Sequence, residues 1–212
     1  MKLINFQLLS QYKNLEELNL EFSPKSPITV LIGNNGSGKT NILEAISHVF
    51  SQLYKKEGQF DFLFKLSYCI NETYYRISYI THQAEGSDPH LIVERRSLNQ
   101  YSEIDLADLE LPKRVICNYS GEDTRLWERI YSEHYNTYIS SIRGRKGTTL
   151  NNLQMIYVSK DFWEIILLVM LIKQNVNDAF RKFISGTLSI SGEVSVNFQL
   201  KPEVKNWTEE NK

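Results

Sequence analysis

The sequence predicts an α/β fold with a mixed sheet. Three features carry this prediction. Residues 28–32 form an apolar run that resembles a strand buried on both faces, and the run ends in a glycine-rich loop. An amphipathic helix is expected directly after the loop, from about residue 39 to 54. Segments rich in β-branched and aromatic residues between 60 and 95 then predict an antiparallel meander.

The remaining elements follow from the same patterns. Residues 3–9 and 15–22 are expected to be strands joined by a polar turn, and the second strand alternates apolar and polar side chains. The meander should contain strands at 60–70, 74–81 and 91–95. Further along, we expect a strand at 114–119, helices at 122–138, 161–173 and 177–185, a loop at 143–152, and strands at 187–190 and 194–200.

Length, charge and hydropathy limit the class of protein. The 212 residues fit one domain, or one domain that carries a lobe, and the net charge of -1 does not indicate a general nucleic-acid binder. The longest apolar run, residues 165–172, is far shorter than the roughly 20 residues needed to span a bilayer. The first residues lack the apolar core of a signal peptide. We therefore expect a cytoplasmic chain without a membrane association.

The glycine-rich loop matches the phosphate-binding pattern G-x-x-x-x-G-K-[ST], and its expected context of strand, loop and helix matches too. The residues that match are Gly33, Asn34, Asn35, Gly36, Ser37, Gly38, Lys39 and Thr40, and Asn41 follows them at the start of the helix. Glycines let the backbone approach phosphates without an intervening Cβ atom, and amides at the start of a helix attract anions.

The loop predicts ATP with Mg²⁺ as the ligand. Lys39 is expected to reach the β- and γ-phosphates as a point charge. The hydroxyl of Thr40 is expected to be a metal ligand. Two features argue against a nucleotide kinase or a GTPase. Two strands precede the strand of the loop, and the guanine-specifying N-K-x-D and the D-x-x-G switch are absent.

A family resemblance adds to this interpretation. It rests on Ile4-Asn5-Phe6, on Tyr12-Lys13-Asn14-Leu15, and above all on Asn35-Gly36-Ser37-Gly38-Lys39 and Asn41-Ile42-Leu43-Glu44-Ala45-Ile46. This stretch resembles the N-terminal lobe of the RecF/SMC-like ABC ATPases, a group that includes AAA-labelled ATPases of bacterial restriction and anti-phage systems. The resemblance implies a lobe with a mixed sheet, an antiparallel meander and a helical insertion. The corresponding boundaries are 1–120 for the lobe, 121–185 for the insertion and 186–212 for returning strands and a frayed tail.

The resemblance also implies catalytic elements that the sequence does not supply. The strand at 114–119 should lead into a loop that contains a glutamine, yet Ser120 and Glu122 are the only candidates there to replace it. The alternative is that this segment forms a turn and the start of a helix. An apolar strand ending in Asp-Glu and the signature loop of ABC ATPases are also absent. We expect that the chain is truncated before the Asp-Glu strand and hydrolyses ATP poorly by itself.

Two other groups of residues have alternative interpretations. Residues 143–147 place three cations among glycines, which suits either a solvated loop or a contact with a DNA backbone. Trp127, Tyr131, Tyr135 and Tyr138 recur at helical spacing and suit either a packed face or a base-stacking surface.

Two functions therefore remain open from the sequence. The first is an ATP-binding lobe of an ABC-type ATPase in DNA repair or anti-phage defence, in which ATP binding drives subunit association. Its partner would be a second copy or a subunit of a defence complex, and the resemblance alone suggests nucleic acid. The alternative is a non-hydrolysing module that senses the nucleotide or mediates an interaction.

Overall fold

The computed structural model describes the chain except for residues 24, 82–87, 120–123, 145–151, 160–161 and 191–212. The chain divides into two compact units, Met1–Val158 and Ser159–Lys212. The lobe boundaries expected from the family resemblance, at 120/121 and 185/186, differ from this division and remain predictions.

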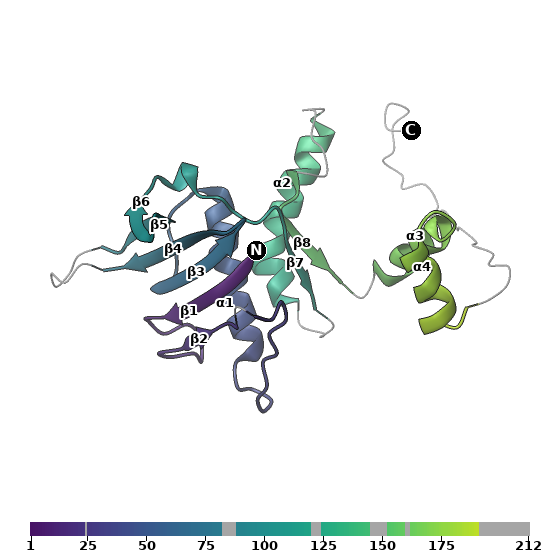
Figure 1. The fold of residues 1–212 in the computed structure, drawn as a ribbon, viewed down its shortest axis with the longest axis horizontal. Helices are drawn as coiled ribbons and strands as arrows, with labels where there is room; N and C mark the ends of the chain where they lie inside the picture. The colour runs from purple at the N-terminus through teal and green to yellow at the C-terminus, as the bar shows by residue number, and fades with distance from the viewer. Residues whose placement is uncertain (24, 82–87, 120–123, 145–151, 160–161, 191–212) are drawn as a thin grey trace, which may run out of the picture. The chain divides into compact units, whose positions relative to one another are not determined.

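Most of the secondary structure lies in the first unit (Figure 1). Its strands are β1 (Lys2–Leu8), β2 (Asn19–Glu21), β3 (Phe64–Ile70), β4 (Thr73–Ile80), β5 (His90–Ser97), β6 (Gln100–Glu103), β7 (Val115–Asn118) and β8 (Met155–Val158). Its helical segments are α1 (Lys39–Lys55), a 3-10 turn (Leu106–Asp108), a π-helical turn (Trp127–Tyr131) and α2 (Ser132–Arg143).

The predicted meander is confirmed as the greater part of an antiparallel sheet. Its strand order is β2-β1-β3-β4-β5-β6. Asn71 and Glu72 both have positive φ, at 47° and 66°, in the tight turn that joins β3 to β4. Two left-handed residues in succession match the right-handed twist of the flanking strands. The turn chemistry therefore sets the register between these two strands.

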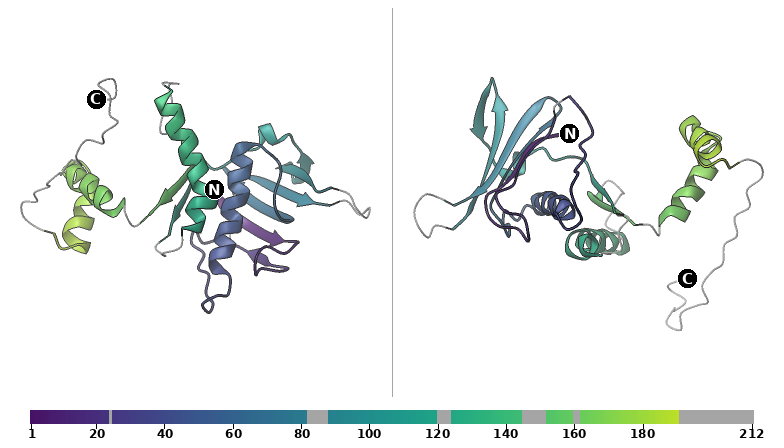
Figure 2. Two further views of the ribbon diagram at one scale, coloured as in Figure 1. Left: turned by 180° about the vertical axis from the view of Figure 1, so that it is seen from behind. Right: turned by 90° about the horizontal axis from the view of Figure 1, so that it is seen from below.

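One face of this sheet is buried by α1 (Figure 2). Along β3 the side chains of Phe64, Leu66 and Tyr68 are buried, while the residues between them are less so. The buried positions of α1 include Val49 and Phe50, as its helical periodicity predicts. The core of the first unit therefore forms between the meander and the helix that follows the glycine-rich loop.

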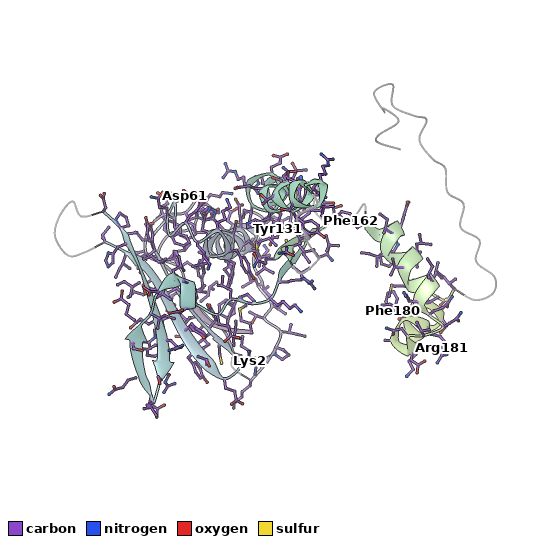
Figure 3. The ribbon with its side chains drawn as sticks, turned by 90° about the horizontal axis from the view of Figure 1, so that it is seen from above. Lys2, Asp61, Tyr131, Phe162, Phe180 and Arg181 are labelled. Carbon is purple, nitrogen blue, oxygen red and sulfur yellow. The ribbon has the colours of Figure 1, made fainter. Side chains whose placement is uncertain are left out.

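A separate pair of strands lies beside the helices. The predicted strand at 114–119 is confirmed as β7, and β8 pairs with it in parallel. Parallel strands need a long connection, and here α2 is part of it. Tyr131, labelled in Figure 3, is almost fully buried and donates a hydrogen bond to Ser47 Oγ of α1 at 3.1 Å. Its ring also lies 5.5 Å from that of Tyr157 in β8.

Trp127 and Tyr131 pack against Tyr157 of β8, as the packed-face interpretation predicts, whereas Tyr135 is 38% exposed. The ring centroid of Trp127 lies 5.6 Å from that of Tyr135 and 5.7 Å from that of Tyr157. The predicted helix from 122 to 138 is confirmed from Arg125 onward, and α2 continues to Arg143.

The prediction that residues 28–32 form a buried central strand is wrong. These residues have no regular secondary structure, and the side chains of Ile28, Val30 and Ile32 are 71%, 72% and 93% exposed. Leu31 alone packs against the core. A strand buried on both faces needs hydrogen-bonded neighbours and a cover on each face. Among the described residues, no strand pairs with this segment, so its apolar composition does not bury it. The two sheets consequently do not join into the single mixed sheet that the sequence predicts.

The second unit is helical in its described part. It contains α3 (Trp163–Lys173), α4 (Asp178–Lys182) and a π-helical turn (Phe183–Thr187). Residues 187–190, predicted as a strand, instead end this helical segment, where Leu188 N donates to Phe183 O and Ile190 N donates to Ile184 O. Backbone amides that bond to carbonyls a few residues earlier are not available to a strand partner. The predicted strand at 194–200 lies outside the described residues. None of the helices in the described ranges has the length and apolar character that crossing a bilayer requires.

Candidate functional site

The glycine-rich loop leads directly into the N-terminus of α1. Gly36 and Gly38 have φ of 81° and 89°, in the left-handed region that favours glycine. Gly38 is the N-cap of α1, and no side chain caps this end of the helix or adds an acidic group to its first turn. The first amides of a helix have no intrahelical partner and carry partial positive charge. This end of α1 is therefore suited to an anion.

Lys39 lies across the mouth of the loop. Its Nζ atom donates hydrogen bonds to the carbonyl oxygens of Gly33 and Asn34, both at 2.7 Å. The hydroxyl of Ser37 lies 3.4 Å from the same nitrogen. The loop residues 33–37 are exposed, so an anion can reach them from solvent.

A turn far away in sequence supports the loop from behind. Asn14 Nδ2 donates to the carbonyl of Gly36 at 3.0 Å, and Asn14 Oδ1 accepts from Asn41 Nδ2 at 2.6 Å. A Cβ atom at Gly38 would lie 2.5 Å from Leu15 Cδ2 and 3.2 Å from Asn14 Oδ1. Glycine at position 38 is therefore required by both conformation and space. Pattern matching to the loop alone does not find Asn14, although it belongs to the stretch that carries the family resemblance.

A buried carboxylate holds the turn at residues 12–15. Glu44 lies on α1 one turn after Thr40, and its side chain is 1% exposed. It accepts from Lys13 Nζ at 2.5 Å and from the Tyr12 hydroxyl at 3.2 Å, and Arg129 Nη1 lies 3.9 Å away. Burial, followed by the negative charge of Glu44, raises the pKa of Tyr12 far above its usual range. The tyrosine therefore remains a hydrogen-bond donor at all physiological pH values.

The candidate metal ligand Thr40 faces the segment that follows β7. Thr40, Glu44 and Leu126 line one small gap together with Tyr119 and Arg125. Ser120 and Glu122, the candidates for a catalytic role, lie outside the described residues. Of this part of the chain, Tyr119 and Arg125 are described, and both lie near Thr40. The basic segment at 143–147 lies mostly outside the described residues as well.

These residues fit a nucleotide with Mg²⁺. Gly36 and Gly38 both have a left-handed backbone, and Leu15 and Asn14 fill the space behind Gly38, which suits a loop whose backbone amides receive an anion. Lys39 supplies a cation at the mouth, and Thr40 supplies a hydroxyl oxygen of the kind that Mg²⁺ accepts. The sequence predicted each of these residues, and the structure brings them together around one helix end.

Comparison with known proteins gives a consistent result. A family model described as "AAA ATPase domain" matches residues 1–185. The "DNA replication and repair protein RecF" of Phocaeicola vulgatus is 27% identical over 188 residues, which cover 74% of this chain and 46% of that protein. RecF of Rickettsia akari is 35% identical over 112 residues, which cover 50% of this chain and 29% of that protein.

A third similar protein is the "Retron Ec83 probable ATPase" of Escherichia coli. It is 47% identical over 49 residues, which cover 21% of this chain and 9% of that protein. The chain thus spans less than half of the length of these curated relatives. The matches confirm the resemblance to RecF-like ATPases that residues 4–46 predict.

Proposed function

Because this chain belongs to the AAA ATPase domain family, we propose that it binds ATP with Mg²⁺ at residues 33–41. One observation carries the proposal. The left-handed glycines Gly36 and Gly38 place the loop at an uncapped helix N-terminus, with the ammonium group of Lys39 across its mouth. Backbone amides and one lysine in this arrangement are suited to the β- and γ-phosphates of a nucleotide.

Mg²⁺ would neutralise charge that develops on the phosphates during phosphoryl transfer. Thr40 is the residue that would contribute a protein ligand to it, since its hydroxyl lies in the first turn of α1. Ser120 and Glu122 remain candidates for orienting a water molecule.

A nucleotide titration tests the site. Lys39→Ala should weaken binding of a fluorescent ATP analogue by about 10- to 150-fold, the equivalent of about 1.5–3 kcal/mol for a hydrogen bond to a charged group. Lys65→Ala provides the matched control, because Lys65 is an exposed lysine on β3, outside the loop. Equal affinities for wild type, Lys39→Ala and Lys65→Ala would exclude this loop as the nucleotide site.

The metal role of Thr40 has its own signature. Thr40→Ala should weaken binding in the presence of Mg²⁺ more than binding in EDTA, because only the metal-bound state uses the hydroxyl. Thr40→Ser keeps the hydroxyl and should restore the difference between the two conditions. A Thr40→Ala variant with the same loss in Mg²⁺ and in EDTA would argue against a metal ligand at this position.

We further propose that the chain is the ATP-binding lobe of an ABC-type ATPase that acts in the cytoplasm in DNA repair or anti-phage defence. ATP binding would drive association with a second copy or with a subunit of a defence complex. The name of the RecF relatives supports the role in DNA repair, and the name of the retron relative supports the ATPase. The defence role and the association rest on the family resemblance of residues 4–46. DNA is the substrate that the RecF relatives suggest.

Sedimentation velocity tests the association. ATP and Mg²⁺, at a concentration that saturates the wild type but not Lys39→Ala, should shift the wild-type chain, or the chain mixed with its partner, to a larger species. Lys39→Ala should show no such shift at that concentration. A sedimentation coefficient that does not respond to ATP, for protein shown to bind it, would contradict association driven by the nucleotide.

The alternative is a non-hydrolysing module that senses ATP. The absence of an apolar strand ending in Asp-Glu from these 212 residues favours it. We expect the chain alone to bind ATP but to release phosphate slowly or not at all, since losing an aligned general base typically costs about 10²- to 10⁴-fold in rate. Phosphate release at ordinary ATPase rates, lost in Lys39→Ala, would instead require a catalytic acid within this sequence.

A further inference from the structure

The tight turn at residues 12–15 packs against the glycine-rich loop. Its ends are joined by two backbone hydrogen bonds, Tyr12 N to Leu15 O and Leu15 N to Tyr12 O, both 2.9 Å long. Lys13 has a positive φ of 57°, which turns the chain sharply at this point. The Leu15 side chain is 6% exposed and belongs to the core. The position of the intervening Asn14 is thereby set by its neighbours on both sides.

The amide group of Asn14 joins the loop to the helix. Its nitrogen donates to Gly36 O, and its oxygen accepts from the side chain of Asn41 on the first turn of α1. Gly36 lies in the middle of the glycine-rich loop and Asn41 lies directly after it, so one side chain connects the loop to the start of the helix. We propose that Asn14 is a positioning residue of the nucleotide site, which keeps the loop in its phosphate-accepting shape before the nucleotide arrives. This inference rests on the nucleotide-binding function proposed above.

The peptide between Gly36 and Ser37 shows how Asn14 would act. In a trans peptide the C=O and N–H bonds point in opposite directions, so fixing one fixes the other. The carbonyl accepts from Asn14, while the N–H of Ser37 donates to Asn34 O at 3.2 Å. This peptide is therefore held at both ends. Without Asn14, only the 3.2 Å hydrogen bond from Ser37 N–H holds this peptide, so its carbonyl can rotate more easily toward the mouth of the loop, where it would repel a phosphate.

Glu44 holds the turn at residues 12–15 in place. The carboxylate lies in the interior of the first unit and bonds to both Lys13 and Tyr12, the two residues that precede Asn14. The turn is thus tied to α1 by an ion pair, and the loop is tied to the turn by Asn14. A site that is ordered in advance avoids part of the entropic cost of binding.

A purely structural role for Asn14 makes a different prediction from a positioning role. If the amide only stabilises the fold, its loss lowers the unfolding temperature and leaves the affinity of the folded protein unchanged. If it positions the loop, its loss lowers the affinity for ATP in protein that is still fully folded. The two roles are separated by measuring the dissociation constant well below the unfolding temperature of each variant.

The experiment compares Asn14→Ala and Asn14→Asp with the control Asn19→Ala. Asn19 is an asparagine in β2 whose Oδ1 accepts a hydrogen bond from Asn5 Nδ2 on the sheet. Asn14→Ala removes two hydrogen bonds and should weaken Mg²⁺-ATP binding by about 3- to 30-fold. Asn14→Asp should weaken it more than Asn14→Ala does, because a carboxylate cannot donate to Gly36 O and adds negative charge behind the phosphates. Asn19→Ala should bind like wild type.

Lys39→Ala, measured in parallel, separates the two proposals. If Lys39→Ala loses affinity while both Asn14 variants bind ATP like wild type, the positioning role is refuted and the nucleotide site stands. If Asn14→Asp binds ATP as tightly as wild type and only Asn14→Ala binds it more weakly, the side chain fills space and its hydrogen bond to Gly36 O is not needed. That outcome also refutes the positioning role. If Lys39→Ala retains full affinity, the nucleotide site itself is elsewhere and both proposals fail.

Discussion

Gly38 provides a quantitative test of the geometry behind the loop. Its φ of 89° lies in the left-handed region, where an L-residue costs about 1–2 kcal/mol. An added Cβ would also lie 2.5 Å from Leu15 Cδ2, closer than carbon atoms can approach without displacement. Because Leu15 is buried in the core, its movement should cost about 1–3 kcal/mol, as other overpacked sites do. We therefore expect Gly38→Ala to lower the free energy of unfolding by about 2–5 kcal/mol.

Gly36 offers a matched control for this prediction. It has a similar φ of 81°, but an added Cβ would meet no atom within 4 Å. Gly36→Ala should therefore carry the backbone cost alone. Both variants share the same change in the entropy of the unfolded chain, so it cancels when they are compared.

Urea denaturation of the two alanine variants and the wild type measures the difference. We expect Gly38→Ala to be less stable than Gly36→Ala by about 1–3 kcal/mol, the contribution of the contact with Leu15. When both glycine variants are made in a Leu15→Ala protein, which lacks the obstructing methyl groups, most of this difference in stability should disappear. Equal stabilities for Gly36→Ala and Gly38→Ala would refute the packing of the 12–15 turn against the loop.

Three further predictions concern the rest of the first unit. Ile32→Ser should change the free energy of unfolding of this chain by less than about 0.5 kcal/mol because Ile32 is exposed, whereas Ile77→Ser in the buried face of β4 should prevent stable folding. A large decrease in the unfolding temperature of Ile32→Ser would contradict the exposure of residues 28–32. Glu44→Gln should cost about 1.5–3 kcal/mol in urea denaturation, since it weakens charged hydrogen bonds in the interior, whereas Glu133→Gln at a largely exposed carboxylate should cost less than about 1 kcal/mol. Burial lowers the pKa of His134, so below about pH 6.5 the unfolded chain binds a proton that the folded protein does not, and the free energy of unfolding should decrease as the pH falls. In His134→Gln this free energy should depend less on pH between 7.5 and 5.5. The same pH dependence in the variant and the wild type would show that His134 does not cause it.

Local patterns were sufficient for many of the elements of the first unit. The helix α1 follows from apolar residues at helical spacing, and the meander follows from alternating strands with turn residues between them. The residues of the proposed site were predicted individually because phosphate binding requires glycines, a lysine and a hydroxyl at fixed spacing within eight positions of the chain. Each of these signals depends on residues that are close together in sequence.

Local patterns were not sufficient to predict whether residues 28–32 are buried or exposed. Their composition is that of a buried strand, and the same composition is compatible with exposure when no neighbouring strand is present. Burial of a strand depends on partners that come from elsewhere in the sequence. The pairing of β7 with β8 illustrates the same point, since 36 residues separate the ends of these strands and only the fold aligns them.

The sequence by itself determined that a glycine-rich loop with the phosphate-binding pattern lies between an apolar segment and an amphipathic helix, and it predicted which residues would contact a nucleotide. Only the tertiary structure decided what holds the loop in place. Asn14 reaches Gly36 across 22 residues of sequence, and Lys13 reaches Glu44 across 31. Residue spacing encodes local conformation directly, whereas contacts over such separations exist only after β1 and α1 have packed into one core.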